Sequence, residues 1–223
     1  MIKYFEGTVF NTPAEAIVNT INCDGFMGAG LALEFALRYP NMLKDYENKC
    51  KNKLIKTGLI DYYKENDITI INFPTKSSFK FPSNIIWIKQ GLQNFKDTYE
   101  ENYIKSVAFP KLGCSNGGLK WDEVQILMEN YLSNLNIDVY ICTDSLNKAQ
   151  GKELEMLEQI NSIPIEELSQ IVKLNQKQKD AIVKNRPFKR FWMISKTPDI
   201  GKTSYKNLFS HFYNNSSTQM KLF

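Results

Sequence analysis

Two glycine-rich segments are the residues of this sequence best suited to hold a ligand. They run from Gly25 to Gly30 and from Gly113 to Gly118, and each lies between a predicted buried strand and a predicted helix. Glycine lets backbone N–H groups approach a ligand closely, and the N-terminus of a helix favours negative charge. One such segment is equally typical of an ordinary turn, but two in one domain favour a ligand that carries phosphate.

The other candidate motifs do not support a nucleotide loop or a zinc site. The triplet Gly201-Lys202-Thr203 lacks the glycine that a P-loop needs at position 196, where Lys196 stands, and no strand precedes it. The four cysteines stand far apart without a CxxC pair, and His211 is the only histidine. We therefore expect reduced thiols, no metal site and no cofactor.

The elements that must position the two glycine segments alternate between short β-branched runs and helical patterns. Strands are expected at residues 16–21, 58–63, 68–73, 106–109 and 137–142, and helices from 31 to before Pro40, at 83–98 and at 121–132. The second and third strands form a hairpin around a short polar loop. This alternation predicts an α/β domain over residues 1–145, with helices on both faces of the sheet.

Residues 146–223 are predicted to form a separate, basic and mainly helical module with a flexible tail. Helical patterns cover 153–160 and 165–185. This part holds 13 basic and 7 acidic residues, whereas residues 1–145 hold 15 and 17. That asymmetry fits a polyanion such as DNA and a solvated helical surface equally well. The candidate DNA contacts are Lys184, Arg186, Lys189 and Arg190.

Composition argues for a folded protein without a membrane or secretion signal. The 223 residues are 43% hydrophobic and 23% charged, which suits one or two compact domains. No window approaches the roughly 18 apolar residues of a membrane helix, and the first residues lack the pattern of a signal peptide. We expect a cytoplasmic protein.

Several segments taken together resemble the macrodomain family. They are Ile17-Val18-Asn19-Thr20-Ile21-Asn22, Met27-Gly28-Ala29-Gly30 and Phe109 to Leu119. Two further segments, Asn72 to Lys76 and Gly117 to Trp121, are most similar to the DarG group, macrodomain antitoxins that remove ADP-ribose from DNA. The resemblance covers residues 1 to about 143. It implies a three-layer α/β/α sandwich around a mixed sheet, with the ligand across the C-terminal ends of the strands.

The resemblance also implies roles for individual residues. Lys76 would be the catalytic residue, with Asn22 beside it at the distal ribose. Thr8 stands where many macrodomains have an acid that holds adenine, so its hydroxyl or a backbone group would take that role. The implied ADP-ribose-binding residues are Thr8, Asn22, Met27, Gly28, Ala29, Gly30, Gly113, Cys114, Ser115, Asn116, Gly117 and Gly118.

A lysine-only centre is the expected chemistry. Related glycohydrolases that act on terminal ADP-ribose pair such a lysine with an aspartate in the second loop, and that place is taken here by Gly117. Lysine attacks an anomeric carbon or its ring-opened aldehyde only as the free amine. The site must therefore lower the pKa of Lys76 by desolvation or by neighbouring positive charge.

The implied function is a DNA ADP-ribosyl glycohydrolase, an enzyme that cleaves an N-glycosidic bond. It would be the antidote to a DNA-modifying toxin or defence enzyme in a bacterium or its virus, and so a DNA-repair enzyme. Its partners would be ADP-ribose as product, ADP-ribosylated single-stranded DNA and the cognate DNA ADP-ribosyltransferase. Two alternatives remain: a non-catalytic reader of ADP-ribose or a related nucleotide, and a hydrolase of protein-linked ADP-ribose.

The last five residues form a separate candidate motif. Gln219-Met220-Lys221-Leu222-Phe223 resembles the short peptide by which bacterial DNA-processing proteins dock on the sliding clamp. Gln219, Leu222 and Phe223 would make the contacts, at the end of a polar tail long enough to reach. A tail that folds back on its own domain is the competing interpretation.

Overall fold

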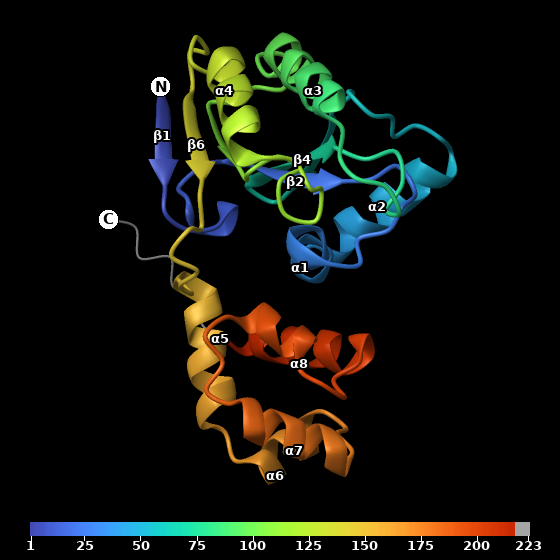
Figure 1. Cartoon of the computed structure of the whole chain (residues 1–223), viewed down its shortest axis with the longest axis vertical. Helices are drawn as coiled ribbons and strands as arrows, with labels where there is room; N and C mark the ends of the chain where they lie inside the picture. The colour runs from blue at the N-terminus through green and yellow to red at the C-terminus, as the bar shows by residue number, and fades with distance from the viewer. Residues whose placement is uncertain (217–223) are drawn as a thin grey trace. The chain divides into compact units, whose positions relative to one another are not determined.

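The computed structural model describes residues 1–216, and the chain divides into two compact units (Figure 1). The first unit is Met1–Ser145, and the second begins at Leu146. Each unit has its own core of buried apolar side chains.

The first unit is built on a six-stranded sheet with the order β1-β6-β5-β2-β4-β3. The strands are β1 (Ile2–Phe5), β2 (Ala16–Ile21), β3 (Asp61–Glu65), β4 (Ile68–Pro74), β5 (Ser106–Phe109) and β6 (Asp138–Cys142). All neighbours are parallel except β3 and β4, which form the expected hairpin. The sheet is therefore mixed, as predicted. The edge strand β1 was not predicted from the sequence, and β3 begins three residues later than expected.

Helices cover both faces of this sheet (Figure 1). One face carries α3 (Ile85–Thr98) and α4 (Trp121–Leu132), and the other carries α1 (Gly30–Arg38) and α2 (Pro40–Lys51), with the short η1 (Val9–Asn11) after β1. The three-layer α/β/α sandwich is thereby confirmed.

Side chains that point alternately to the two faces of the sheet along β2 and β4 form the two hydrophobic cores of the first unit. Val18 and Ile71 are fully buried in the cluster that includes α3 and α4, whereas Ile17 and Ile70 are fully buried in the cluster that includes α1 and α2. Successive side chains of a strand point to opposite faces, so an apolar run buried on both sides is required for a parallel sheet between two helical layers. This requirement explains why β2 reads as a nearly continuous apolar run.

Two helix boundaries differ from the sequence prediction. Pro40 begins α2 instead of only ending the preceding helix, because proline at the first helical position loses no hydrogen bond. Helix α3 begins at Ile85 and not at residue 83, because Asn84 is its N-cap: the Asn84 side chain accepts a hydrogen bond from the backbone N–H of Ile86.

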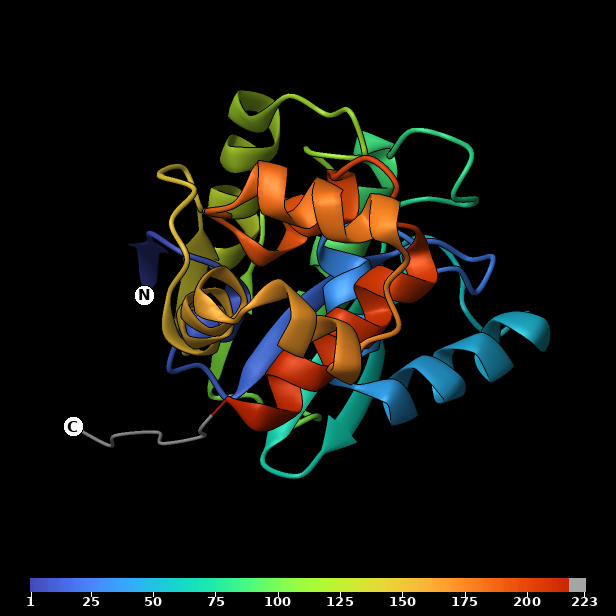
Figure 2. The ribbon, with the colours of Figure 1, turned by 90° about the horizontal axis from the view of Figure 1, so that it is seen from below.

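The second unit is helical and contains α5 (Gly151–Ser162), α6 (Ile165–Ile171), α7 (Gln176–Asn185), η2 (Phe191–Lys196) and α8 (Lys202–Asn215). Figure 2 shows α5 nearly end-on. The predicted continuous helix over 165–185 is wrong, because Asn175 caps a new helix with its side chain. The long helix α8 was not predicted. Its Leu208, Phe209 and Phe212 are almost completely buried.

Candidate active site

Three loops leave the sheet at the carboxyl ends of neighbouring strands. The first glycine loop (residues 22–30) follows β2, the lysine loop (75–84) follows β4, and the second glycine loop (110–120) follows β5. Strand β2 lies between β4 and β5 and is parallel to both. The three loops therefore emerge at one edge of the sheet, the usual position of a ligand site in an open α/β sheet.

Asn22 holds the first glycine loop together from inside. Its Oδ1 accepts hydrogen bonds from the backbone N–H groups of Asp24 (2.9 Å) and Phe26 (3.5 Å) and from the hydroxyl of Tyr46 (3.1 Å). Its Nδ2 donates to the carbonyl of Phe26 at 2.6 Å, and the side chain is only 7% exposed. The amide thus fixes the shape of the loop. Its contact with the distal ribose stays a prediction.

The two glycine loops touch at Gly30 and Asn116. Gly30 has φ +57°, and a Cβ atom there would lie 2.6 Å from Nδ2 of Asn116. A Cβ atom on Gly28 would lie 2.2 Å from the ring of Phe26. The absence of side chains at these two glycines therefore allows Asn116 and Phe26 to pack directly on the backbone of the first glycine loop.

Gly117 is the most tightly confined residue of the second glycine loop. A Cβ atom there would lie 2.1 Å from the carbonyl oxygen of Gly113 and 2.4 Å from Oγ of Ser83. The carbonyl of Gly117 also accepts a 2.9 Å hydrogen bond from the backbone N–H of Ser83. Gly118 is the opposite case: its φ is +78°, and no atom of the described residues lies within 4 Å of the position of its Cβ. Its backbone faces open space.

Lys76 joins the lysine loop to the second glycine loop. It follows Thr75, whose backbone N–H donates a 3.0 Å hydrogen bond to the carbonyl of Ile21 and so ties the start of the loop to β2. Its Nζ donates a 2.6 Å hydrogen bond to the backbone carbonyl of Asn116. The side chain is half-buried, and desolvation lowers the pKa of its amine from the ordinary lysine value. A lowered pKa favours the free amine that a nucleophilic lysine requires, and the catalytic role of Lys76 remains a prediction.

The sequence and fold of the first unit are similar to those of known proteins. The Macro domain family model matches residues 18–128. The solved macrodomain of Mycobacterium tuberculosis DarG is 39% identical with a TM-score of 0.63, and the alignment covers 65% of this chain and 99% of that one. The chain belongs to the macrodomain family.

Two further relatives of this macrodomain are informative. A curated protein of Mycobacterium tuberculosis named DNA ADP-ribosyl glycohydrolase is 42% identical over 133 residues, covering 56% of this chain and 37% of its own. The structure of Thermosipho africanus DarTG in complex with ADP-ribose is 32% identical with a TM-score of 0.62, covering 67% of this chain and 43% of its own. This chain therefore spans well under half the length of the curated relative.

An acidic residue in the macrodomain site was missed by the sequence analysis. Oδ2 of Asp24 accepts hydrogen bonds from the hydroxyl of Ser78 (2.5 Å) and from the backbone N–H of Phe79 (3.1 Å). Asp24 thus ties the first glycine loop to the lysine loop. Its place next to Asn22 in a glycine-rich turn was the available signal.

The remaining predicted ligand residues of the macrodomain contribute mainly backbone. The side chain of Met27 is 6% exposed, and its sulfur accepts a weak hydrogen bond from Nδ2 of Asn19 at 3.7 Å. Ala29 is the N-cap of α1. In the second glycine loop, the carbonyls of Cys114 and Ser115 accept the N–H of Gly118 at 3.2 and 3.3 Å. Ligand contacts at these residues remain predictions.

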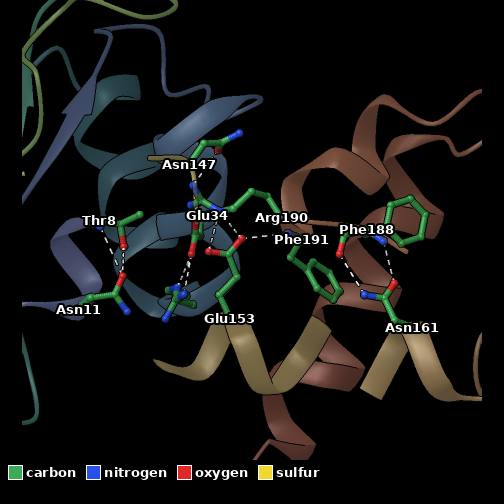
Figure 3. Close-up of polar contacts among 10 residues, drawn as sticks. Thr8, Asn11, Glu34, Asn147, Glu153, Asn161, Phe188, Arg190 and Phe191 are labelled. Carbon is green, nitrogen blue, oxygen red and sulfur yellow. Dashed lines mark hydrogen bonds and ion pairs between the residues drawn. The ribbon is translucent and has the colours of Figure 1, made fainter. Parts of the chain in front are cut away.

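Thr8 begins the short helix after β1 (Figure 3). Its hydroxyl donates a 2.8 Å hydrogen bond to Oδ1 of Asn11. Because the hydroxyl hydrogen is used in this bond, the lone pairs of Oγ1 are the groups left to accept a hydrogen bond from an amino group. An adenine amino group is such a donor, and its recognition by Thr8 remains a prediction.

Arg190, predicted to bind DNA, is buried in the core of the second unit, and that prediction is wrong. The residue is 2% exposed, and its Nε donates to both carboxylate oxygens of Glu153, at 2.9 and 3.1 Å (Figure 3). The same carboxylate accepts the backbone N–H of Phe191 at 2.9 Å. Removing an unpaired guanidinium from water is very costly, so a buried arginine requires such a partner.

Arg186 is also partly shielded from solvent, whereas the two lysines are exposed, and contact of these residues with DNA remains a prediction. Nη1 of Arg186 donates to the carbonyl of Ile163 at 2.8 Å, and its Nε and Nη2 are shielded from solvent. Lys184 and Lys189 are exposed. The predicted clamp residues Gln219, Leu222 and Phe223 lie outside the described residues.

Residues 1–216 contain neither a cluster of metal ligands nor a membrane-spanning helix. Within this range, no group of three or more histidine, cysteine, aspartate or glutamate side chains could hold a metal ion. No helix in the same range is long and apolar enough to cross a membrane.

Proposed function

We propose that this macrodomain removes ADP-ribose from ADP-ribosylated DNA. The observation that carries the proposal is the position of Lys76, whose Nζ lies 2.6 Å from the carbonyl of Asn116 and whose pKa is lowered by desolvation. The similarity to proteins named DNA ADP-ribosyl glycohydrolase points to the same substrate class. ADP-ribose would lie along the two glycine loops, with the diphosphate against backbone N–H groups.

In the proposed reaction, Lys76 acts as the nucleophile. Its Nζ lone pair forms a bond to C1 of the distal ribose while the N-glycosidic bond breaks, and the electron pair leaves with the nitrogen of the base. The base takes the proton that the lysine nitrogen loses. The oxygen of a water molecule then bonds to C1 while the C1–Nζ bond breaks, one proton of the water passes to Nζ, and free ADP-ribose and the amine are released. Formation of a covalent intermediate divides one difficult displacement into two easier ones.

The second glycine loop favours this lysine-only mechanism over one that uses a loop carboxylate. A side chain at position 117 would collide with the carbonyl of Gly113 and with Ser83. An aspartate therefore cannot replace Gly117 without rearrangement of the loop. A hydrolase of protein-linked ADP-ribose that relies on such an aspartate is disfavoured for the same reason.

DNA as the substrate also gives the second unit a role. We propose that its exposed lysines, Lys184 and Lys189 among them, bind DNA phosphates, and that residues Gln219 to Phe223 dock on a sliding clamp. Release of counterions from phosphates supplies the binding free energy, so salt should weaken the binding of DNA.

A DNA substrate would place this antidote activity in the cytoplasm of a bacterium, or of the host of a bacterial virus, together with a cognate DNA ADP-ribosyltransferase.

The direct test is to incubate the protein with ADP-ribosylated single-stranded DNA and to measure released ADP-ribose. Release from DNA at a higher rate than from ADP-ribosylated protein is the expected result. If ADP-ribose binds in a calorimetric titration but neither substrate is cleaved, the chain is a non-catalytic reader. Preferential release from protein would show that the substrate class is wrong.

A further inference from the structure

Two exposed phenylalanine side chains contact each other on two loops of the candidate site. Phe26 of the first glycine loop is 43% exposed, and Phe79 of the lysine loop is 48% exposed. Their ring centroids are 5.0 Å apart, with an interplanar angle of 50°. The pair joins two different loops of the site, and much of each ring still faces solvent.

Hydrogen bonds on both sides hold this pair in place. The backbone of Phe26 is bound through its N–H and carbonyl by the amide of Asn22. The backbone N–H of Phe79 donates to the carboxylate of Asp24 at 3.1 Å. The backbone that carries each ring is thus held by a buried or loop-bridging polar group, which limits the conformational entropy lost when a ligand binds.

The pair also borders both parts of the proposed reaction site. The ring of Phe26 lies on the backbone of Gly28, where a Cβ atom would be 2.2 Å from it. Phe79 is three residues after Lys76, so their Cα atoms are at most about 11 Å apart even in a fully extended chain. A group bonded to C1 of the distal ribose, where Lys76 would attack, lies within reach of these rings.

We propose that Phe26 and Phe79 form a stacking platform for a base of the single-stranded DNA that carries the ADP-ribose. Aromatic side chains with a neighbouring cation are typical of sites that bind single strands, because every base has a face that stacks. Here the cation is Lys80, an exposed residue whose Nζ lies 5.8 Å from the centroid of the Phe79 ring. This inference rests on the proposed function.

The proposed platform would supply a selectivity that the ADP-ribose site alone would not. A base in a duplex is stacked on its neighbours and cannot lie on a protein ring without being extruded, whereas a single strand offers its bases freely. We therefore expect the protein to prefer ADP-ribosylated single strands over the same modification within a duplex, and the preference to depend on the two rings.

The test compares Phe26→Ala, Phe79→Ala and Phe79→Trp with the parental protein. Both alanine variants should raise KM for an ADP-ribosylated single-stranded oligonucleotide about tenfold, while the Kd for free ADP-ribose stays within about twofold. Phe79→Trp should restore the parental KM. Phe81→Ala is the matched control, because Phe81 is a 59% exposed phenylalanine of the same loop.

The outcomes separate this inference from the proposed function. If the parental protein releases no ADP-ribose from DNA, the proposed function fails. If the parental protein is active and the alanine variants keep its KM, only the platform is refuted. A weaker Kd for free ADP-ribose in the variants would instead assign the rings to adenine, and an equal loss in Phe81→Ala would show that the pair has no special role.

Discussion

Nζ of Lys76 donates a 2.6 Å hydrogen bond to the backbone carbonyl of Asn116, 40 positions later in the chain. This bond links the loop after β4 to the loop after β5. The acceptor is a neutral carbonyl and not a carboxylate, so this contact is not an ion pair. Desolvation by burial lowers the pKa of Lys76.

Replacing Lys76 with alanine should separate binding from catalysis. We expect Lys76→Ala to release ADP-ribose from DNA at least about 100-fold more slowly, because the nucleophile is lost. The Kd for ADP-ribose, measured by calorimetry, should change by less than about threefold. Lys120→Ala is the control, since Lys120 is an exposed lysine of the second glycine loop. A near-parental rate in Lys76→Ala would favour a water molecule positioned by Asn22.

The reaction should accelerate as the pH rises. Only the neutral amine attacks, so the rate follows the deprotonated fraction of Lys76 and increases up to its pKa. Because desolvation lowers that pKa, the half-maximal rate should lie below 10.5, the ordinary lysine value. A pH–rate profile at saturating substrate tests this. Lys76→Arg should be inactive at every pH, and a parental rate that falls between about pH 7 and 9 would contradict a lysine nucleophile.

The two adjacent glycines of the second loop should respond differently to a carboxylate. Gly117→Asp should distort the loop, lower the melting temperature and abolish ADP-ribose binding, because its Cβ would lie 2.1 Å from the carbonyl of Gly113. Gly118→Glu should lose binding but fold, since its Cβ meets open space and the cost is only the strain of a positive φ. Unchanged ADP-ribose affinity in Gly118→Glu would exclude the second glycine loop from the site.

The neighbours Lys189 and Arg190 should have separable roles. Arg190→Ala leaves the buried carboxylate of Glu153 without its ion-pair partner, so unfolding in denaturant should show a loss of about 3–5 kcal/mol. Lys189→Ala should cost less than about 0.5 kcal/mol and instead weaken single-stranded DNA binding, with a shallower dependence on salt. Equal stability of the two variants would refute the structural role of Arg190.

The clamp proposal is tested with a peptide. A labelled peptide of residues 216–223 should show saturable polarisation binding to purified sliding clamp with a Kd below about 1 mM. The triple variant Gln219→Ala, Leu222→Ala, Phe223→Ala is the control and should not bind. Equal binding of the two peptides would end the proposal.

The sequence by itself determined the architecture of the first unit. Buried β-branched runs with intervening helical patterns specify a sheet between helical layers, since a strand that is apolar on both faces must be covered on both. The two glycine segments and Lys76 were also visible in the sequence, because their residue types and the resemblance to macrodomains mark them. These features depend on the types and spacing of residues that are close together in the sequence, so the sequence alone predicts them.

Only the tertiary structure decided which residues meet. The edge strand β1 has four residues, two of them exposed, and its place in the sheet comes from pairing with β6 at the far end of the unit. The partner of Arg190 is Glu153, 37 positions earlier in the chain. The excess of basic residues in the sequence therefore led to the wrong prediction that Arg190 binds DNA, whereas this arginine forms a buried ion pair in the core. The confinement of Gly117 likewise depends on Ser83, which a distant segment supplies. Burial and long-range contact are properties of the folded chain, and no local pattern encodes them.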